Sequence, residues 1–176
     1  QVQRVASTAV PEGTFSERTA GEDGVLRTIR ENRYLGDTLV ESVVLSEEVV
    51  KEPVTAVVAY GVGGTVATSR SAATRYSYVL DMTATAYTYG ESGHWGDVTA
   101  SGKAVQVGYV AVDPRVTPLG SRLYITYPDG SECYGFAVAE DTGGAIKGNR
   151  IDLFFETYDE AISFGRRKVT VYVLAD

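Results

Sequence analysis

Two aspartates that flank one glycine-rich loop are the residues best suited to acid–base chemistry in this sequence. An apolar run ends at Asp141, a Thr-Gly-Gly turn occupies 142–144, and a second apolar run holds Asp152 between Ile151 and Leu153. An aspartate inside an apolar strand faces solvent or a cleft, and partial burial raises its pKa towards that of a general acid. The residues alone also fit a plainer interpretation, in which Asp141 caps a turn and Asp152 is an ordinary alternating strand residue.

The elements that must position these acids are short strands separated by turn signals. Candidate strands cover residues 78–87, 105–112, 122–127, 134–140, 150–155 and 168–174. The turn signals between them include TPLG at 117–120 and PDG at 128–130. Only residues 157–165 are typical of a helix, with Thr157 as N-cap and Gly165 at its end. Many short strands and one short helix predict a small closed barrel.

The amino-terminal third has a different organisation. Residues 24–32, 33–44 and 45–58 alternate polar and apolar side chains, which predicts a small, elongated antiparallel β module. Its acids Glu41, Glu47, Glu48 and Glu52 are strung along the strands, as on a solvated face. Residues 61–73 have no hydrophobic period and are typical of a linker. We therefore predict a module at 1–62, a linker at 63–77 and a second domain at 78–176.

The composition excludes several classes of function. The chain has 176 residues, of which 44% are hydrophobic, and a formal net charge of -7 without a Lys/Arg cluster, which argues against a nucleic-acid partner. No apolar run approaches the roughly 20 residues that span a bilayer. One cysteine and one histidine can supply neither an intrachain disulfide nor the usual zinc ligands. Stability is therefore expected from packing alone.

Two stretches resemble known families. The run from Met82 to Leu174 resembles the three-aspartate (3D) domain of stationary-phase-survival proteins and of the membrane-bound lytic transglycosylase A family. The matching pieces are MTATAYT (82–88), VTASGK (98–103), YVAVDPRVTPLGSRLYI (109–125), YGFAVAEDTGGAIKGNRIDLFF (134–155) and FGRRKVTVYVL (164–174). Most of residues 1–62 resembles the G-five module, a short β-rich repeat found beside cell-wall enzymes.

The first resemblance implies a fold and a site. The fold is a double-psi β-barrel, so the whole chain is expected to be all-β. Asp113, Asp141 and Asp152 are implied to line one cleft, with Asp152 as acid and base. Two segments depart from the family pattern: residues 125–134 predict a protruding β-hairpin with PDG at its tip, and residues 91–97 bring His94 and Trp95 together.

Further residues are candidates for holding a substrate. They are Thr85 and Tyr87 on the first barrel strand, Ser101 and Gly102, Gly143 and Gly144, Lys147, and Trp95. Ser101 has no histidine partner within sequence reach, so it is not interpreted as a nucleophile. Trp95 fits a sugar-stacking platform as well as it fits an aromatic that covers the barrel end. His94 is interpreted as a surface loop residue.

The resemblance implies a lytic transglycosylase. Such an enzyme cleaves the MurNAc–GlcNAc bond of peptidoglycan and leaves a 1,6-anhydro sugar, without a metal or an organic cofactor. The alternatives are a two-carboxylate hydrolase, in which Asp141 or Asp113 activates water, and a domain that only binds wall glycan or a protein. The implied partners are peptidoglycan strands and other cell-wall enzymes. The implied location is the cell wall, after secretion, in a Gram-positive bacterium.

Overall fold

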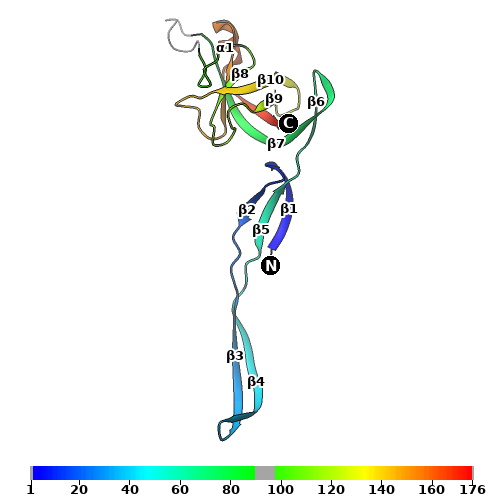
Figure 1. The fold of residues 1–176 in the computed structure, drawn as a ribbon, viewed down its shortest axis with the longest axis vertical. Helices are drawn as coiled ribbons and strands as arrows, with labels where there is room; N and C mark the ends of the chain where they lie inside the picture. Colours follow the sequence, from blue (N-terminus) through cyan, green and yellow to red (C-terminus); the bar gives the residue numbers. More distant parts are fainter. Residues whose placement is uncertain (1, 90–97, 176) are drawn as a thin grey trace. The chain divides into compact units, whose positions relative to one another are not determined.

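Strands make up most of the chain, as the short alternating runs predict. A computed structural model describes residues 2–89 and 98–175 (Figure 1). Its strands are β1 (Val2–Glu12), β2 (Phe15–Thr19), β3 (Val25–Leu35), β4 (Thr38–Lys51), β5 (Ala56–Gly61), β6 (Gly64–Thr68), β7 (Ser71–Tyr87), β8 (Tyr109–Val112), β9 (Arg122–Thr126), β10 (Glu132–Asp141), β11 (Arg150–Phe154) and β12 (Arg167–Leu174). The only helix in the described ranges is α1 (Tyr158–Phe164). The predicted all-β class is confirmed.

The chain divides into two compact units. One unit comprises Gln1–Ala6 and Phe15–Tyr60, and the other comprises Ser7–Thr14 and Gly61–Asp176. The first unit holds β2, β3 and β4, and the second holds the strands from β6 onward together with α1. The predicted domain boundaries at residues 62 and 78 remain a prediction, namely that the parts on either side fold independently.

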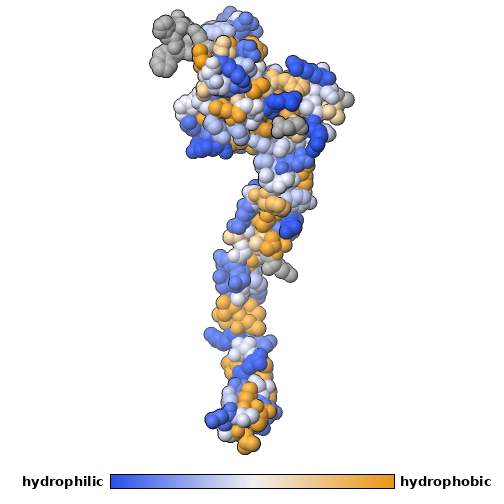
Figure 2. Space-filling view, viewed as in Figure 1, coloured by the Kyte–Doolittle hydropathy of each residue, from blue (hydrophilic) through white to orange (hydrophobic). Residues whose placement is uncertain are grey.

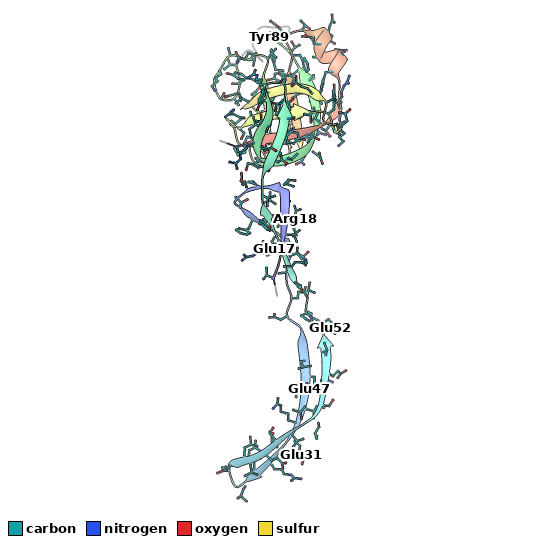
Figure 3. All side chains as sticks on the ribbon, turned by 90° about the vertical axis from the view of Figure 1, so that its right-hand side faces the viewer. Glu17, Arg18, Glu31, Glu47, Glu52 and Tyr89 are labelled. Carbon is teal, nitrogen blue, oxygen red and sulfur yellow. The ribbon has the colours of Figure 1, made fainter. Side chains whose placement is uncertain are left out.

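The first unit is built from thin sheets. β5 lies between β1 and β2, and β3 pairs only with β4 in an antiparallel two-stranded sheet. Every residue of β4 is exposed, so apolar and polar side chains both reach the surface (Figure 2). The acids predicted on a solvated face are indeed exposed, and Figure 3 shows Glu47 and Glu52 on this ribbon. A two-stranded sheet has no interior, which explains why its alternation buries nothing.

The second unit is a ring of six strands. Its order is β11-β8-β10-β9-β12-β7, and a further pairing of β11 with β7 joins the two ends of that row. Two of these pairings are parallel, β10 with β8 and β11 with β7. β6 adds to β7 as an outer neighbour, antiparallel to it. The strand ring agrees with the barrel that the sequence predicts.

Strand alternation fills the ring and leaves the acids outside the core. Val110 and Val112 on β8 are fully buried in the core cluster, as are Ile151 and Leu153 on β11. Because successive strand side chains point to opposite faces, Asp152 lies on the other face of β11 from its two apolar neighbours. The same apolar pattern that forms the core therefore sets the direction of the acid.

The segment predicted as a linker, 63–77, consists largely of paired strands. Residues 64–68 and 71–87 form β6 and β7, with Gly64 opposite Tyr76 and Thr68 opposite Ser71. The Thr68 hydroxyl donates to the Ser71 carbonyl and accepts from its amide, which holds the turn between the strands. Glycine, serine and threonine favour loops locally, but here their backbone is paired along β7. The sequence signal reflects composition alone, and it misses the local pairing of β6 with β7.

Two local predictions are confirmed. Thr157 caps α1 in a capping box with Glu160, and Gly165 ends the helix with φ 63°. β9 and β10 form the expected antiparallel hairpin, in which the Gly130 amide donates to the Tyr127 carbonyl. Both features depend on residues close in sequence, which explains why the sequence alone identifies them. Within the described residues, no helix has the length and apolar character needed to cross a membrane.

Candidate functional site

A row of paired residues crosses four neighbouring strands at the centre of the site. Ala111 on β8 pairs with Asp141 on β10 at one side and with Asp152 on β11 at the other. Asp152 in turn pairs with Thr85 on β7. The two acids are therefore separated by one strand whose residue at that position carries only a methyl group. A bulge in β10 between Ala139 and Asp141 brings Asp141 into this register.

Asp152 is half-buried and hydrogen-bonded to its neighbour on β7. The Thr85 hydroxyl donates to Asp152 Oδ1 at 2.6 Å. Burial raises the pKa of Asp152; the Thr85 hydrogen bond opposes this shift, and the charge of Asp141 adds to it. A carboxyl group with a raised pKa retains its proton at higher pH and so suits a general acid.

A small cavity opens beside this acid. Its volume is about 210 Å³, and its lining residues are Thr83, Thr85, Ala145, Ile146, Arg150, Asp152 and Arg166. Gly143 supports one wall, since a Cβ at that position would lie 2.7 Å from Ile146 Cγ1. Gly144 has no neighbouring atom within 4 Å of such a Cβ. Of the two candidate glycines, only Gly143 is therefore required by packing.

Asp141 accepts hydrogen bonds from both sides of the site. The amides of Ala100 and Thr142 each donate to Asp141 Oδ1 at 2.8 Å, and the Tyr87 hydroxyl lies 3.4 Å from Oδ2. Burial raises the pKa of Tyr87, and the charges of Asp141 and Asp152 raise it further. The phenol therefore stays protonated and can act as a hydrogen-bond donor to the pair of acids.

Glu140, the residue before Asp141, anchors the loop that supplies the Ala100 amide. The Ser101 hydroxyl donates to Glu140 Oε2 and the Lys103 ammonium donates to Glu140 Oε1, each at 2.5 Å. The hydrogen bond from Lys103, followed in size by that from Ser101, holds the pKa of Glu140 below its usual range. The Ser101 amide also donates to the Glu140 carbonyl at 3.1 Å. The glutamate is buried, so these donors offset the free-energy cost of taking its charge out of water.

Asp113 is occupied by a different set of partners. The Arg115 guanidinium donates to both of its carboxylate oxygens, at 3.0 and 2.7 Å, and the Gly148 amide donates to Oδ2 at 2.8 Å. The Arg115 hydrogen bonds, followed by that of Gly148, hold the pKa of Asp113 well below its usual range. Asp113 lies two positions beyond Ala111 along the chain. The structure thus brings Asp141 and Asp152 together and joins Asp113 to the loop between them.

The remaining candidates divide between the site and its surroundings. Thr85 and Tyr87 touch the acids, while Ser101 and Gly102 belong to the loop that Glu140 anchors. Lys147 is exposed and forms no ion pair with a described residue. Trp95 and His94 lie outside the described residues.

Three residues that matter here were not singled out from the sequence: Glu140, Lys103 and Arg115. The only sequence signal for Glu140 is that it lies directly before Asp141. The only one for Arg115 is that it lies two residues after Asp113. Among the residues described, no group of three His, Cys, Asp or Glu side chains is close enough to hold a metal ion. Asp152, with its raised pKa, and the neighbouring Asp141 are the pair of carboxyl groups that the described residues offer for acid–base chemistry.

Comparisons with known proteins agree with both resemblances. Residues 108–175 match the 3D domain and residues 1–62 match the G5 domain. The cell wall-binding protein YocH of Bacillus subtilis is 48% identical over 99 residues, which cover 54% of this chain and 32% of YocH. The putative cell wall shaping protein YabE of the same organism is 41% identical over 100 residues, which cover 54% of this chain and 23% of YabE. The chain thus spans a third or less of the length of these relatives.

Two solved structures match part of the chain, both with low TM-scores. The crystal structure of MltA from E. coli is 27% identical, with a TM-score of 0.39, and the match covers 46% of this chain and 28% of MltA. A Clavibacter michiganensis expansin in complex with cellohexaose is 19% identical, with a TM-score of 0.41, and the match covers 56% of this chain and 51% of the expansin. The family models thus match two separate parts of the chain, the G5 domain at residues 1–62 and the 3D domain at residues 108–175, and neither match covers half of it.

Proposed function

We propose that this chain cleaves peptidoglycan strands as a lytic transglycosylase, with Asp152 as the general acid. The observation that carries the proposal is the half-buried Asp152, whose pKa is raised by burial and by Asp141. The match to the 3D domain and the names of the two relatives, which concern the cell wall, support the substrate class. The same names support a location at the cell wall.

The reaction needs one proton and no water. Protonated Asp152 donates to the oxygen that bridges N-acetylmuramic acid and N-acetylglucosamine, and the glycosidic bond breaks as an oxocarbenium-like centre develops. The Asp152 carboxylate then accepts the proton of the C6 hydroxyl of the same muramyl sugar, whose oxygen bonds to C1. The product is a 1,6-anhydro ring, and Asp152 is protonated again. The intramolecular attack removes the need for a second group to activate water.

Asp141 and Tyr87 have supporting roles in this proposal. Asp141, two strands away from Asp152 in the same row, favours the protonated acid before the bond breaks and stabilises positive charge on the sugar afterwards. Tyr87 donates to Asp141 and orients it. Asp113 acts as a positioning residue, because it ties the chain at Gly148 to the end of β8. Thr85 orients Asp152 through its short hydrogen bond.

A second candidate is a domain that binds wall glycan without cutting it. The observation in its favour is the name of YocH, a cell wall-binding protein, together with the 48% identity to it. In that case the same row of polar residues would contact a sugar strand, and the raised pKa of Asp152 would have no catalytic consequence.

Mass spectrometry of digested peptidoglycan distinguishes these functions. The wild-type protein should release muropeptides with 1,6-anhydro ends, each lighter by one water than a hydrolysis product. Asp152→Asn should lower the rate by roughly 10²–10⁴-fold, the range for loss of a general acid. Asp37→Asn, in the exposed turn between β3 and β4, is the matched control and should cleave like the wild type. Ordinary reducing ends would instead establish a hydrolase, and binding without products would establish the glycan-binding domain.

A further inference from the structure

A second and larger cavity lies on the barrel unit, and neither Asp141 nor Asp152 lines it. Its volume is about 450 Å³, and it opens between the β6–β7 turn and strands β8, β9 and β10. The side chains that give it chemical character are Arg70, Gln106, Tyr109, Arg122 and Phe136. None of the residues that line this cavity is acidic, although the chain has 23 Asp and Glu residues against 16 Lys and Arg residues.

The two arginines are available for a ligand. Neither Arg70 nor Arg122 forms a salt bridge with a residue in the described ranges 2–89 and 98–175. A guanidinium group is planar, always charged and matched to two oxygens of a carboxylate or a phosphate. Two such groups around one cavity, with no carboxylate among the lining residues, favour an anionic ligand.

Aromatic rings give the cavity a firm wall and orient one arginine. Arg70 Cζ lies 4.7 Å from the centre of the Phe136 ring, so the guanidinium is placed over an aromatic face. Phe136 is held in turn by Tyr124, whose ring centre is 5.0 Å away. An ordered guanidinium loses less side-chain entropy on binding than a free one does. Tyr109 contributes a second aromatic ring to the lining of the cavity.

We propose that this cavity binds an anionic group of a cell-wall polymer, either a carboxylate or a phosphate, through Arg70 and Arg122. The inference does not depend on cleavage by Asp152, because it concerns separate residues and a binding step. Tyr109 in the cavity wall precedes Ala111 in the row of acids by two positions on β8, a rise of about 7 Å along the strand. The cavity and the row of acids therefore share strand β8, and in this proposal a polymer held by the arginines extends along that strand towards the acids.

Binding to purified cell walls tests the proposal with the chain of residues 1–176. The protein carries Asp152→Asn in every sample, so that cleavage does not change the walls during the measurement. Adding Arg70→Gln and Arg122→Gln together should weaken binding at low salt by about ten-fold or more and reduce the salt dependence of the dissociation constant. Arg18→Gln with Arg30→Gln, which removes the same charge from exposed positions of the first unit, is the matched control and should bind like the parent. Thermal melting establishes that each variant is folded.

Two wall preparations identify the source of the anion. One retains the phosphate-bearing polymers of the wall, and the other has lost them after treatment with hydrofluoric acid. A defect of the Arg70 and Arg122 variant on intact walls alone assigns the site to phosphate, and an equal defect on both preparations assigns it to the carboxylates of peptidoglycan. A folded variant that binds both preparations as tightly as its parent would overturn the proposal. A defect of the same size in the control variant would overturn it too, because nonspecific charge would then explain the binding.

Discussion

The Thr85 hydroxyl donates to Asp152 Oδ1 at 2.6 Å, across the parallel pairing that closes the strand ring. This hydrogen bond lowers the pKa of Asp152, against the larger effect of burial. Thr85→Val keeps the shape of the side chain and removes the donor, so the pKa of Asp152 should rise further. The titration of the Asp152 carboxyl carbon, followed by NMR, measures this directly. Thr85→Ser retains the hydroxyl and should titrate like the wild type, whereas a downward shift in Thr85→Val would contradict the role given to this bond.

Replacing Asp152 should not weaken the fold at neutral pH. Its pKa is raised in the folded state, so the folded protein binds the proton more tightly than the unfolded chain does, and ionisation of Asp152 costs stability above the folded pKa. Asp152→Asn should therefore melt at the same temperature as the wild type at pH 7, or a few degrees higher. The higher melting temperature of Asp152→Asn should disappear as the pH falls below the pKa of an aspartate in the unfolded chain, about 3.9. Melting curves at pH 7 and pH 3 check this, and a large loss at pH 7 would show that the carboxylate itself supports the fold.

Glu140 should have the opposite pH dependence. Its pKa is lowered in the folded state by Lys103 and Ser101, so it contributes stability above the unfolded value of about 4.3 and loses it as the pH falls through the folded pKa. Glu140→Gln should lower the melting temperature by several degrees at pH 7 and by less at pH 3. The NMR signal of the Ala100 amide should shift as well, because the loop that positions this donor is released. Glu156→Gln, at an exposed site, is the control, and equal effects of the two substitutions would refute the anchoring role.

Two adjacent glycines should differ in their tolerance of a methyl group. A Cβ at Gly143 would meet Ile146, which lines the cavity beside Asp152, whereas a Cβ at Gly144 would meet nothing within 4 Å. Gly143→Ala should therefore displace the cavity wall and lower both the melting temperature and the rate of glycan cleavage. Gly144→Ala should leave both close to the wild type. If the two variants behave alike, the close approach at Gly143 does not support the cavity.

The sequence predicts well what depends on near neighbours. The capped helix at 157–165 and the hairpin around PDG rest on residues a few positions apart, and both are confirmed. The strands of the barrel follow from the apolar alternation around residues such as Ile151 and Leu153. Residues 63–77 are an exception, because most of them pair locally in the β6–β7 hairpin although their composition is typical of loops.

The candidate site shows the same division between local and distant effects. Family resemblance selects Asp141 and Asp152, and the structure places them in one row with Ala111. No spacing rule reveals that Arg115 and Gly148 occupy Asp113, because the donor at Gly148 lies 35 residues away. Nor does the sequence show that Glu140, rather than Asp141, holds the loop at Ser101 and Lys103. Side-chain partners across the barrel are determined by packing, which single-sequence patterns do not encode.

The closure of the strand ring also has a kinetic consequence. Thr85 and Asp152 are 67 residues apart, and they meet only through the parallel pairing of β7 with β11. Contacts at such separation require closure of a long loop and are expected to form late and slowly during folding. A chain whose synthesis has stopped before β11 has neither Asp152 nor the strand that Thr85 faces. The acid and its hydrogen-bond donor thus come together only when the barrel is finished, so the folding reaction itself delays the appearance of the site.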